Sequence, residues 1–426
     1  MRLDEYVDGL DRDESIELRR LAEEKSYAVT EYIDDARTRF DETLSGETMV
    51  GSTAPSVFVG RSSYPNVSTG LLAPVGDEND AADYVTTGEW YRRGYNIDDV
   101  FQRRTGLLNS TRQSNVDVHD VWDGFVGTQR EVAIADRPVD IELGLDESPG
   151  FDIDDSLEDI AAPRGPRASA ETARVTENPS VPRAVEKTLS DDDWRAEGAI
   201  AYLYRRGFDV YEINNVLSVG ALGRGDNRRL VPTRWSITAV DDTVGQYLRG
   251  TIRNAPSIDQ TLVWHNSYMG NDYWIIATPG DWEFELLELK APGSIWNPDP
   301  DGQLYMAADS EGYEGRTDYV EETSGAYYAA RLGVLEALAD RDRQATVFVI
   351  RHATSGYWAP VGVWQIRESI RDALESEPAV AETFHGAVRQ LVPRLPVSLS
   401  ELRRKSTLAA GIQSDLSAFG GGVDGR

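Results

Sequence analysis

The pattern of apolar and polar residues predicts several separate ordered segments. In residues 14–43 apolar side chains recur at helical spacing behind a capping Ser15, so this stretch is expected to be a helix. The run Val57-Phe58-Val59 predicts a short strand that ends in a turn at Gly60. Residues 88–108 form a compact aromatic-rich segment.

The pattern changes between residues 144 and 193. Asp, Glu, Pro, Ser and Ala dominate there, and aromatic residues are scarce. Such a composition cannot bury much apolar surface. We therefore expect mainly a solvated loop or a partly disordered acidic insert.

Order is expected to resume near Trp194 with a helix over residues 196–207. Alternating apolar positions then predict a series of strands at residues 234–240, 260–265, 272–278 and 283–289.

The second half begins near Gly302 and contains the clearest helix of the chain, from Ser324 to Ala339. The remaining predicted elements are strands at 345–351 and 356–363, a helix at 364–374, and a tail helix capped by Ser398 or Ser400.

Mixed strands and helices without a regular βαβ repeat predict an α+β fold with two mixed α/β domains. The expected divisions are residues 1–296, which include the insert, residues 297–397, and a tail of residues 398–426.

The charge balance points to the solvent in which the protein works. The 426 residues carry 73 acidic and 43 basic side chains, for a net charge of −30, and only four of the bases are lysines. An evenly spread acidic excess with scarce lysine resembles the proteins of salt-accumulating haloarchaea. Concentrated salt screens such self-repulsion, so the charge does not exclude DNA as a partner.

Several classes of site are excluded or unsupported. The chain has no cysteine, so disulfides, thiolate metal sites and cysteine nucleophiles are absent. Its histidines lack metal-ligand spacing, and no cofactor is evident. We see no signal peptide and no apolar run of membrane-spanning length, so a soluble cytoplasmic protein is expected.

The tail carries a candidate partner-binding motif. Gln413, Leu416 and Phe419 stand at successive steps of three and are followed by Gly420. In one 3₁₀ turn the two apolar side chains project from the same side. This arrangement resembles the peptide that the DNA-replication sliding clamp (PCNA) captures, although such peptides usually have a second aromatic residue where Gly420 stands. The same spacing also suits the last turn of a helix that packs onto its own domain.

A second candidate is a metal site on the strand that ends at Lys290. Asp281, Glu288 and Lys290 together resemble the acids and lysine with which nucleases hold Mg²⁺ and position water. Magnesium is expected only on this reading. The alternative is an edge strand with charged residues facing solvent.

A third candidate is an anion or nucleotide pocket. Arg61 and Arg104 offer guanidinium groups that match phosphates, and Tyr64 offers a ring that stacks on a base. Alternatively, Arg61 pairs with one of the many acidic side chains.

Several long blocks resemble the archaeal Nre family of DNA-repair proteins. They are Pro55-Ser-Val-Phe-Val-Gly-Arg-Ser-Ser-Tyr-Pro65, Ser324-Gly-Ala-Tyr-Tyr-Ala-Ala-Arg331, Arg343-Gln-Ala-Thr-Val-Phe-Val349 and Pro360-Val-Gly-Val-Trp-Gln-Ile-Arg-Glu368. The resemblance implies N- and C-terminal Nre domains, a role in DNA-damage repair, and a clamp-binding peptide at Gln413, Leu416 and Phe419. The cysteine-rich zinc finger of some members does not carry over. Whether this chain is a repair enzyme, such as a nuclease or a nucleotide-using transferase, or a non-catalytic adaptor stays open.

Overall fold

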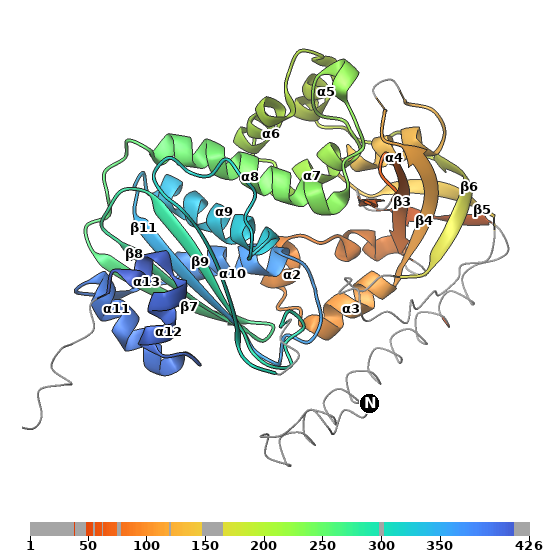
Figure 1. Ribbon diagram of the computed structural model, residues 1–426. Helices are drawn as coiled ribbons and strands as arrows, with labels where there is room; N and C mark the ends of the chain where they lie inside the picture. Colours follow the sequence, from red (N-terminus) through yellow and green to blue (C-terminus); the bar gives the residue numbers. More distant parts are fainter. Residues whose placement is uncertain are drawn as a thin grey trace, which may run out of the picture.

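The computed structural model describes residues 38, 48–53, 56–61, 63–74, 78–118, 121–146, 165–297 and 302–412. These residues form two six-stranded sheets with helices between and around them (Figure 1). The predicted α+β class with two mixed units is confirmed. Across the described residues, every helix is too short or too polar to cross a lipid bilayer.

The N-terminal sheet has the strand order β1-β5-β6-β4-β3-β2, and only its β4–β6 pair is parallel. Its strands are β1 (Thr48–Thr53), β2 (Val57–Val59), β3 (Asn66–Pro74), β4 (Leu107–Asn115), β5 (Val139–Leu145) and β6 (Arg167–Val175). Its helical segments are η2 (Glu78–Tyr84), α2 (Gly88–Arg92), α3 (Ile97–Thr105) and α4 (Gly124–Ala133).

The expected insert at residues 144–193 is largely ordered where the structure describes it, so that prediction was wrong for residues 165–193. Strand β6 pairs with both β5 and β4 inside the sheet, and α5 (Arg183–Ser190) follows it. The buried positions of β6 include Ala168 and Ala170. Alanine gives little hydrophobic signal in a sequence, and the partners with which β6 pairs, β4 and β5, lie before it in the chain and are not part of its local pattern.

Helices α6 (Ala196–Arg205), α7 (Val210–Ser218) and α8 (Thr233–Ile252) form the middle of the chain, with the short η3 (Gly225–Asn227) before α8. The strand predicted at residues 234–240 was wrong, because this stretch begins α8. One row of its buried residues recurs every four positions. The seven residues from 234 to 240 contain less than two such repeats, so the helical period cannot be recognised in them. This row comprises Ser236, Val240, Val244, Leu248 and Ile252, and Asp241 and Gly245 are buried beside it.

The C-terminal sheet has the order β10-β9-β11-β8-β7-β12, with β9 and β11 as its parallel pair. Its strands are β7 (Thr261–Tyr268), β8 (Asn271–Thr278), β9 (Glu283–Lys290), β10 (Tyr305–Glu311), β11 (Thr346–Ala353) and β12 (Ala379–Ala381). The division expected near residue 296 therefore falls between β9 and β10, two neighbouring strands of one sheet.

Helices cover both faces of this sheet (Figure 1). On one face lie α9 (Gly325–Asp340) and α10 (Trp364–Glu375). The other face carries the C-terminal helices α11 (Phe384–Leu391), η4 (Val392–Arg394), α12 (Leu399–Lys405) and α13 (Thr407–Ala410). The predicted tail helix is confirmed, with a capping box between Ser398 and Glu401.

The strand predicted at residues 356–363 was also wrong. This stretch belongs to the loop between β11 and α10, in which Tyr357, Ala359 and Val361 are buried. They pack with Trp90 and Phe101 of α2 and α3. The alternation of buried residues in this loop therefore results from its packing against α2 and α3, and the loop does not pair in a sheet.

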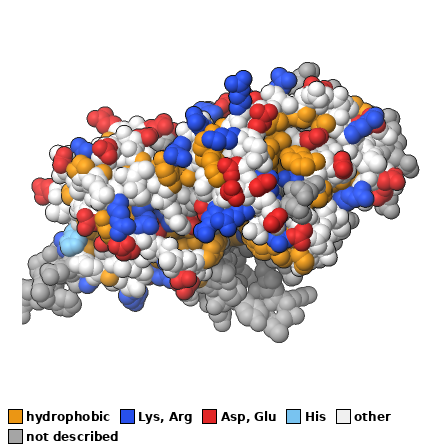
Figure 2. Space-filling model, turned by 90° about the horizontal axis from the view of Figure 1, so that it is seen from above, with side chains coloured by type: hydrophobic (Ala, Val, Ile, Leu, Met, Phe, Trp, Pro, Cys, Tyr) orange, Lys and Arg blue, Asp and Glu red, His pale blue; other side chains and the backbone are white. Residues whose placement is uncertain are grey.

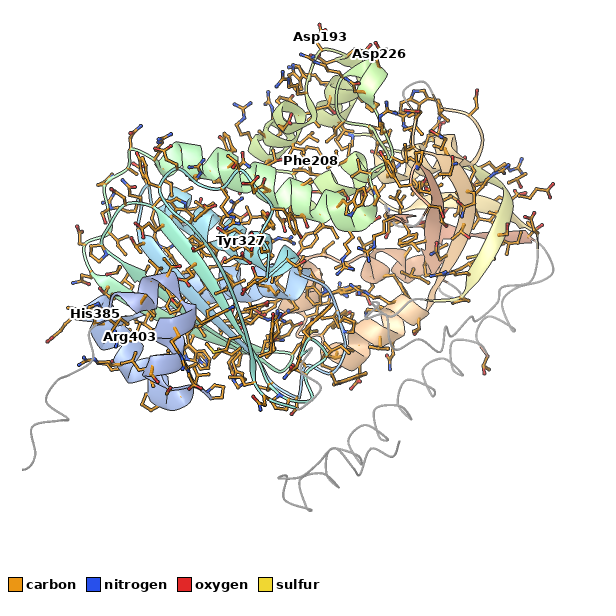
Figure 3. All side chains as sticks on the ribbon, in the orientation of Figure 1. Asp193, Phe208, Asp226, Tyr327, His385 and Arg403 are labelled. Carbon is orange, nitrogen blue, oxygen red and sulfur yellow. The ribbon has the colours of Figure 1, made fainter. Side chains whose placement is uncertain are left out.

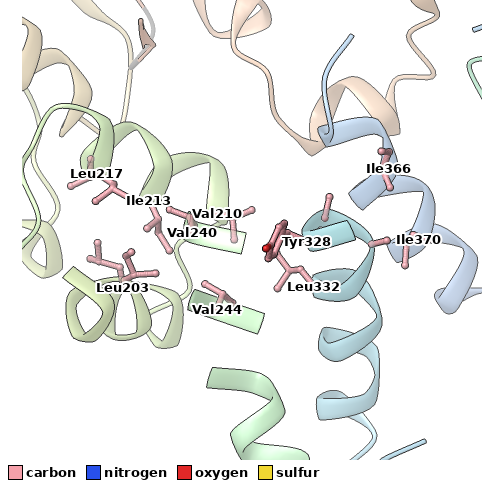
Figure 4. Close-up of a cluster of buried hydrophobic side chains, with 14 of the residues drawn as sticks. Leu203, Val210, Ile213, Leu217, Val240, Val244, Tyr328, Leu332, Ile366 and Ile370 are labelled. Carbon is pink, nitrogen blue, oxygen red and sulfur yellow. The ribbon is translucent and has the colours of Figure 1, made fainter. Parts of the chain in front are cut away.

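One continuous core joins the two sheets. In Figure 4, Val240 and Val244 of α8 lie beside Tyr328 and Leu332 of α9, with Ile366 and Ile370 of α10 beyond them. The helices between the sheets thus fix the two halves of the chain to one another.

Candidate functional site

The carboxyl ends of the parallel strands β9 and β11 hold a buried charged group of residues. Glu288 and Arg351 are register partners, and Glu288 Oε1 accepts a hydrogen bond from Arg351 Nη1 at 2.5 Å. Lys290 Nζ lies 3.2 Å from Glu288 Oε2. The structure therefore brings Glu288 and Lys290 together, and each oxygen of the Glu288 carboxylate pairs with a basic side chain.

The surroundings of Arg351 complete this ion-pair network. Its Nε donates to Asn271 Oδ1 at 2.9 Å, and its guanidinium carbon lies 5.2 Å from the centre of the Tyr357 ring. Burial acts to lower the pKa of Arg351, but Tyr273 and Glu288 outweigh it and raise that pKa above its ordinary value. Arg351 is thus held as a cation in its pair with Glu288.

Asp281 is not part of this group. It lies before β9, where its carbonyl accepts a hydrogen bond from Thr346 Oγ1 at 3.0 Å. Glu288 stands seven positions further along the chain, mostly along β9, so the two residues lie roughly 20 Å apart. Within the ranges that the structure describes, no cluster of three or more His, Asp or Glu side chains is placed to hold a metal ion.

A second network of buried charges joins the helices between the sheets. Arg331 of α9 donates to Glu311 of β10 at 2.8 Å and to Asp242 of α8 at 2.5 Å, while Arg367 of α10 pairs with Asp241 at 2.5 Å. The ring of Tyr327, labelled in the interior in Figure 3, lies 5.7 Å from the Arg331 guanidinium carbon. These contacts tie three helices to the C-terminal sheet.

Arg104 and Arg61 occupy different environments. Arg104 of α3 is half-buried and donates to the carbonyl of Val361 at 2.7 Å, and burial lowers its pKa to about 10. Arg61 is exposed in the loop that follows β2. The structure records no contact between the two, and Arg104 instead connects α3 to the loop between β11 and α10.

Tyr64 has a neighbour that the sequence did not reveal. Its ring centre lies 5.8 Å from that of Trp235, at an interplanar angle of 45°, and each side chain is 48% exposed. Arg61 precedes Tyr64 by three positions, and Arg234 adjoins Trp235. We call these four residues the aromatic–arginine surface. The helical spacing of apolar residues in 233–252 leaves Trp235 outside the buried row, and this spacing was the one sequence signal that Trp235 is exposed.

Charges of both signs mix on one face of the molecule (Figure 2). On the face shown in Figure 2, Lys and Arg side chains lie interspersed with Asp and Glu side chains and small apolar areas. The acidic excess is therefore distributed rather than gathered in one patch on that face.

The tail motif of Gln413, Leu416, Phe419 and Gly420 lies outside the described residues. The last described residue, Ile412, is buried against the helices of the C-terminal sheet. The start of α13 is held from β9, because Glu285 accepts hydrogen bonds from Ser406 Oγ at 3.0 Å and from the amides of Thr407 and Leu408 at 2.9 and 2.7 Å.

Comparison with known proteins gives consistent matches over nearly the whole chain. The family model described as archaeal Nre, N-terminal, matches residues 21–297, and that described as archaeal Nre, C-terminal, matches residues 311–419. No solved structure matches significantly.

Three relatives illustrate this similarity. DNA repair protein NreA of Haloferax volcanii is 62% identical over 420 residues, which are 98% of this chain and 100% of that protein. NreA of Archaeoglobus fulgidus is 38% identical over 335 residues, covering 78% and 82% of the two chains. DNA repair protein NreB of the same organism is 34% identical over 360 residues, covering 84% and 88%.

Proposed function

Because this chain belongs to the archaeal Nre family, we propose that it is a DNA-repair factor recruited to the replication sliding clamp through its C-terminal peptide. The names of its relatives support the repair role. The peptide would supply Leu416 and Phe419 as an apolar pair and Gln413 as a hydrogen-bonding residue. A role on DNA also supports the inference that the protein works in the cytoplasm.

The observation that supports recruitment is the position of the motif, directly after the last described residue. That residue, Ile412, is buried, and Glu285 caps the helix that precedes it. Gln413 is the next residue in the sequence, so the motif begins where the described part of the domain ends. Seven residues then reach to Phe419, a span of at most about 25 Å. A clamp bound there would sit close to the helices α11–α13.

The affinity expected for such a peptide is modest. Each buried Leu or Phe anchor contributes about 1.5–3 kcal/mol, and ordering the segment costs about 2–5 kcal/mol. The two anchors alone therefore leave at most about 4 kcal/mol, so micromolar binding, about −8 kcal/mol in total, is an upper limit that also requires hydrogen bonds from Gln413 and the backbone. Such an affinity suits a tether that is engaged and released repeatedly.

The alternative of a Mg²⁺-dependent nuclease at Glu288 has little support in the geometry. Both Glu288 oxygens pair with cations, and Asp281 lies at the far end of β9. A nucleotide-using transferase and a non-catalytic adaptor remain as alternatives. Turnover on damaged DNA, with and without Mg²⁺, separates an enzyme from an adaptor.

Calorimetric titration of the full chain into the sliding clamp of its own organism, in multimolar KCl, tests the proposal. The wild type is expected to bind with micromolar affinity, and Leu416→Ala/Phe419→Ala is expected to abolish binding. Val423→Ala, in the same tail but outside the motif, is the matched control and should bind as the wild type does. Equal heats for the wild type and the double variant would reject recruitment through this peptide.

A further inference from the structure

Three of the four exposed aromatic side chains among the described residues belong to segments around one small apolar cluster. The cluster comprises Val59, Val67, Val116, Val118 and Leu230, with Val121 packed against it. Tyr64 lies in the turn between Val59 and Val67, and Trp122 follows Val121. Trp235 contacts Tyr64. Exposed aromatic rings gathered in this way are characteristic of binding surfaces.

Of these three rings, Tyr64 and Trp235 have the most freedom to accept a ligand. The Arg130 guanidinium carbon lies 4.2 Å from the centre of the Trp122 ring and covers part of it. The Tyr64 and Trp235 rings are tilted by 45° at 5.8 Å, so they do not stack fully on one another. About half of each side chain faces solvent.

The protein holds this pair in place from both sides. The amide of Val59 donates to Thr233 Oγ1 at 2.9 Å, which fixes the end of β2 to the start of α8. The turn itself is closed by hydrogen bonds from the amide of Asn66 to the carbonyl of Ser63 at 2.9 Å and from the amide of Gly60 to the carbonyl of Ser68 at 2.7 Å. Rings that are already positioned lose little entropy when a ligand binds.

The charge around the pair favours a ligand that carries negative groups. Arg61 and Arg234 are both exposed, and neither makes an ion pair or hydrogen bond with the described residues. The first turn of α8 contains no acidic residue. Two exposed arginines without an ionic partner among the described residues are notable in a chain with 73 acidic and 43 basic side chains.

We propose that the aromatic–arginine surface binds unpaired DNA, with its bases stacked on Tyr64 and Trp235 and its phosphates beside Arg61 and Arg234. This rests on the proposed function only for the choice of DNA as the nucleic acid. Every base offers a flat face, so stacking needs no sequence specificity. Stacking also does not depend on phosphate contacts, which lose affinity as salt rises.

The salt dependence of binding separates this surface from an ordinary basic groove. For single strands, the logarithm of the binding constant falls with the logarithm of salt concentration with a slope of about −0.7 per neutralised phosphate. Two arginines therefore predict a slope no steeper than about −1.4.

The test is fluorescence anisotropy of a labelled oligothymidylate titrated with the full chain across a range of KCl concentrations. Replacing either ring by alanine is expected to weaken binding about fivefold or more. Tyr64→Phe/Trp235→Phe is expected to keep most of the affinity because it keeps two stacking rings. Arg61→Gln/Arg234→Gln is expected to flatten the salt dependence.

Tyr319→Ala is the matched control, since Tyr319 is 56% exposed but lies outside this surface. Thermal melting establishes that each variant is folded. Binding that survives Tyr64→Ala/Trp235→Ala, duplex bound as tightly as single strand, or no binding at any salt would overturn the proposal. A failure of DNA binding at this surface can be told apart from a failure of clamp recruitment. The ring variants should bind the clamp as the wild type does, and Leu416→Ala/Phe419→Ala should bind DNA as the wild type does.

Discussion

Asp309 of β10 holds Thr323, which directly precedes Ser324, the N-cap of α9. Its Oδ2 accepts hydrogen bonds from both the amide and the hydroxyl of Thr323, at 2.8 and 2.6 Å. The amides of Glu321 and Glu322 donate to the same carboxylate at 3.1 and 3.0 Å. One carboxylate thereby orders the turn and the start of the longest helix on this sheet.

This arrangement predicts a pH dependence of stability. Burial acts to raise the pKa of Asp309, but the hydrogen bonds outweigh it and hold the pKa below its ordinary value. A carboxyl whose folded pKa is depressed stabilises the protein above its unfolded pKa of about 3.9, and this contribution is lost as pH falls through the folded pKa. Asp309→Asn should therefore be less stable than the wild type at pH 7, with a difference that shrinks on acidification.

Denaturant unfolding at constant salt between pH 7 and pH 3 measures that difference. Asp193→Asn, at an exposed position, is the control and should follow the wild type. A gap between Asp309→Asn and wild type that stays constant over this range would show that the carboxylate charge is not what orders the turn.

The buried pair of Arg351 and Glu288 should be far more costly to break than an exposed pair. Arg351→Ala leaves Glu288 buried with Lys290 as its one remaining charged partner among the described residues, and we expect it to lower the free energy of unfolding by about 3–5 kcal/mol. Arg92→Ala removes a 2.7 Å pair with Glu89 whose arginine side chain is 69% exposed, and it should cost at most about 1 kcal/mol. Chemical denaturation of the two variants makes the comparison, and similar losses would contradict a structural role for the Glu288 network.

Glu285 should control the stability of the last described helix. Glu285→Ala removes the acceptor for Ser406 Oγ and for the amides of Thr407 and Leu408, which we expect to cost about 2 kcal/mol or more. Hydrogen exchange should then speed up at Thr407 and Leu408 while the strands of the sheet stay protected. Unchanged exchange at these two amides would mean that α13 is held by its apolar contacts alone.

The sequence predicted those elements whose signal is local. The apolar run Val347–Ile350 predicted a strand, and Ser398, one of two serines predicted to cap the tail helix, does so; both signals lie within a few residues. Strand β6 and the loop around Tyr357 were misread because their structure depends on partners elsewhere in the chain.

The sites show the same limit. Sequence spacing brought Glu288 and Lys290 to one strand end, but Arg351, which neutralises Glu288, is 63 residues away. It also grouped Arg104 with Arg61, whereas folding turns Arg104 toward Val361 and sets Trp235 beside Tyr64. Pairings across such separations follow from the topology of the sheets, and no local pattern encodes them.

The most direct test of the central claim, recruitment to the sliding clamp, is a gain of affinity at Gly420. Clamp-binding peptides usually carry a second aromatic residue at this position, so Gly420→Tyr should add one buried ring. Calorimetric titration of this variant into the clamp in multimolar KCl should show binding about tenfold tighter than the wild type, equivalent to about 1.4 kcal/mol. Affinity that is unchanged or weaker in Gly420→Tyr would contradict capture of this tail as a clamp peptide.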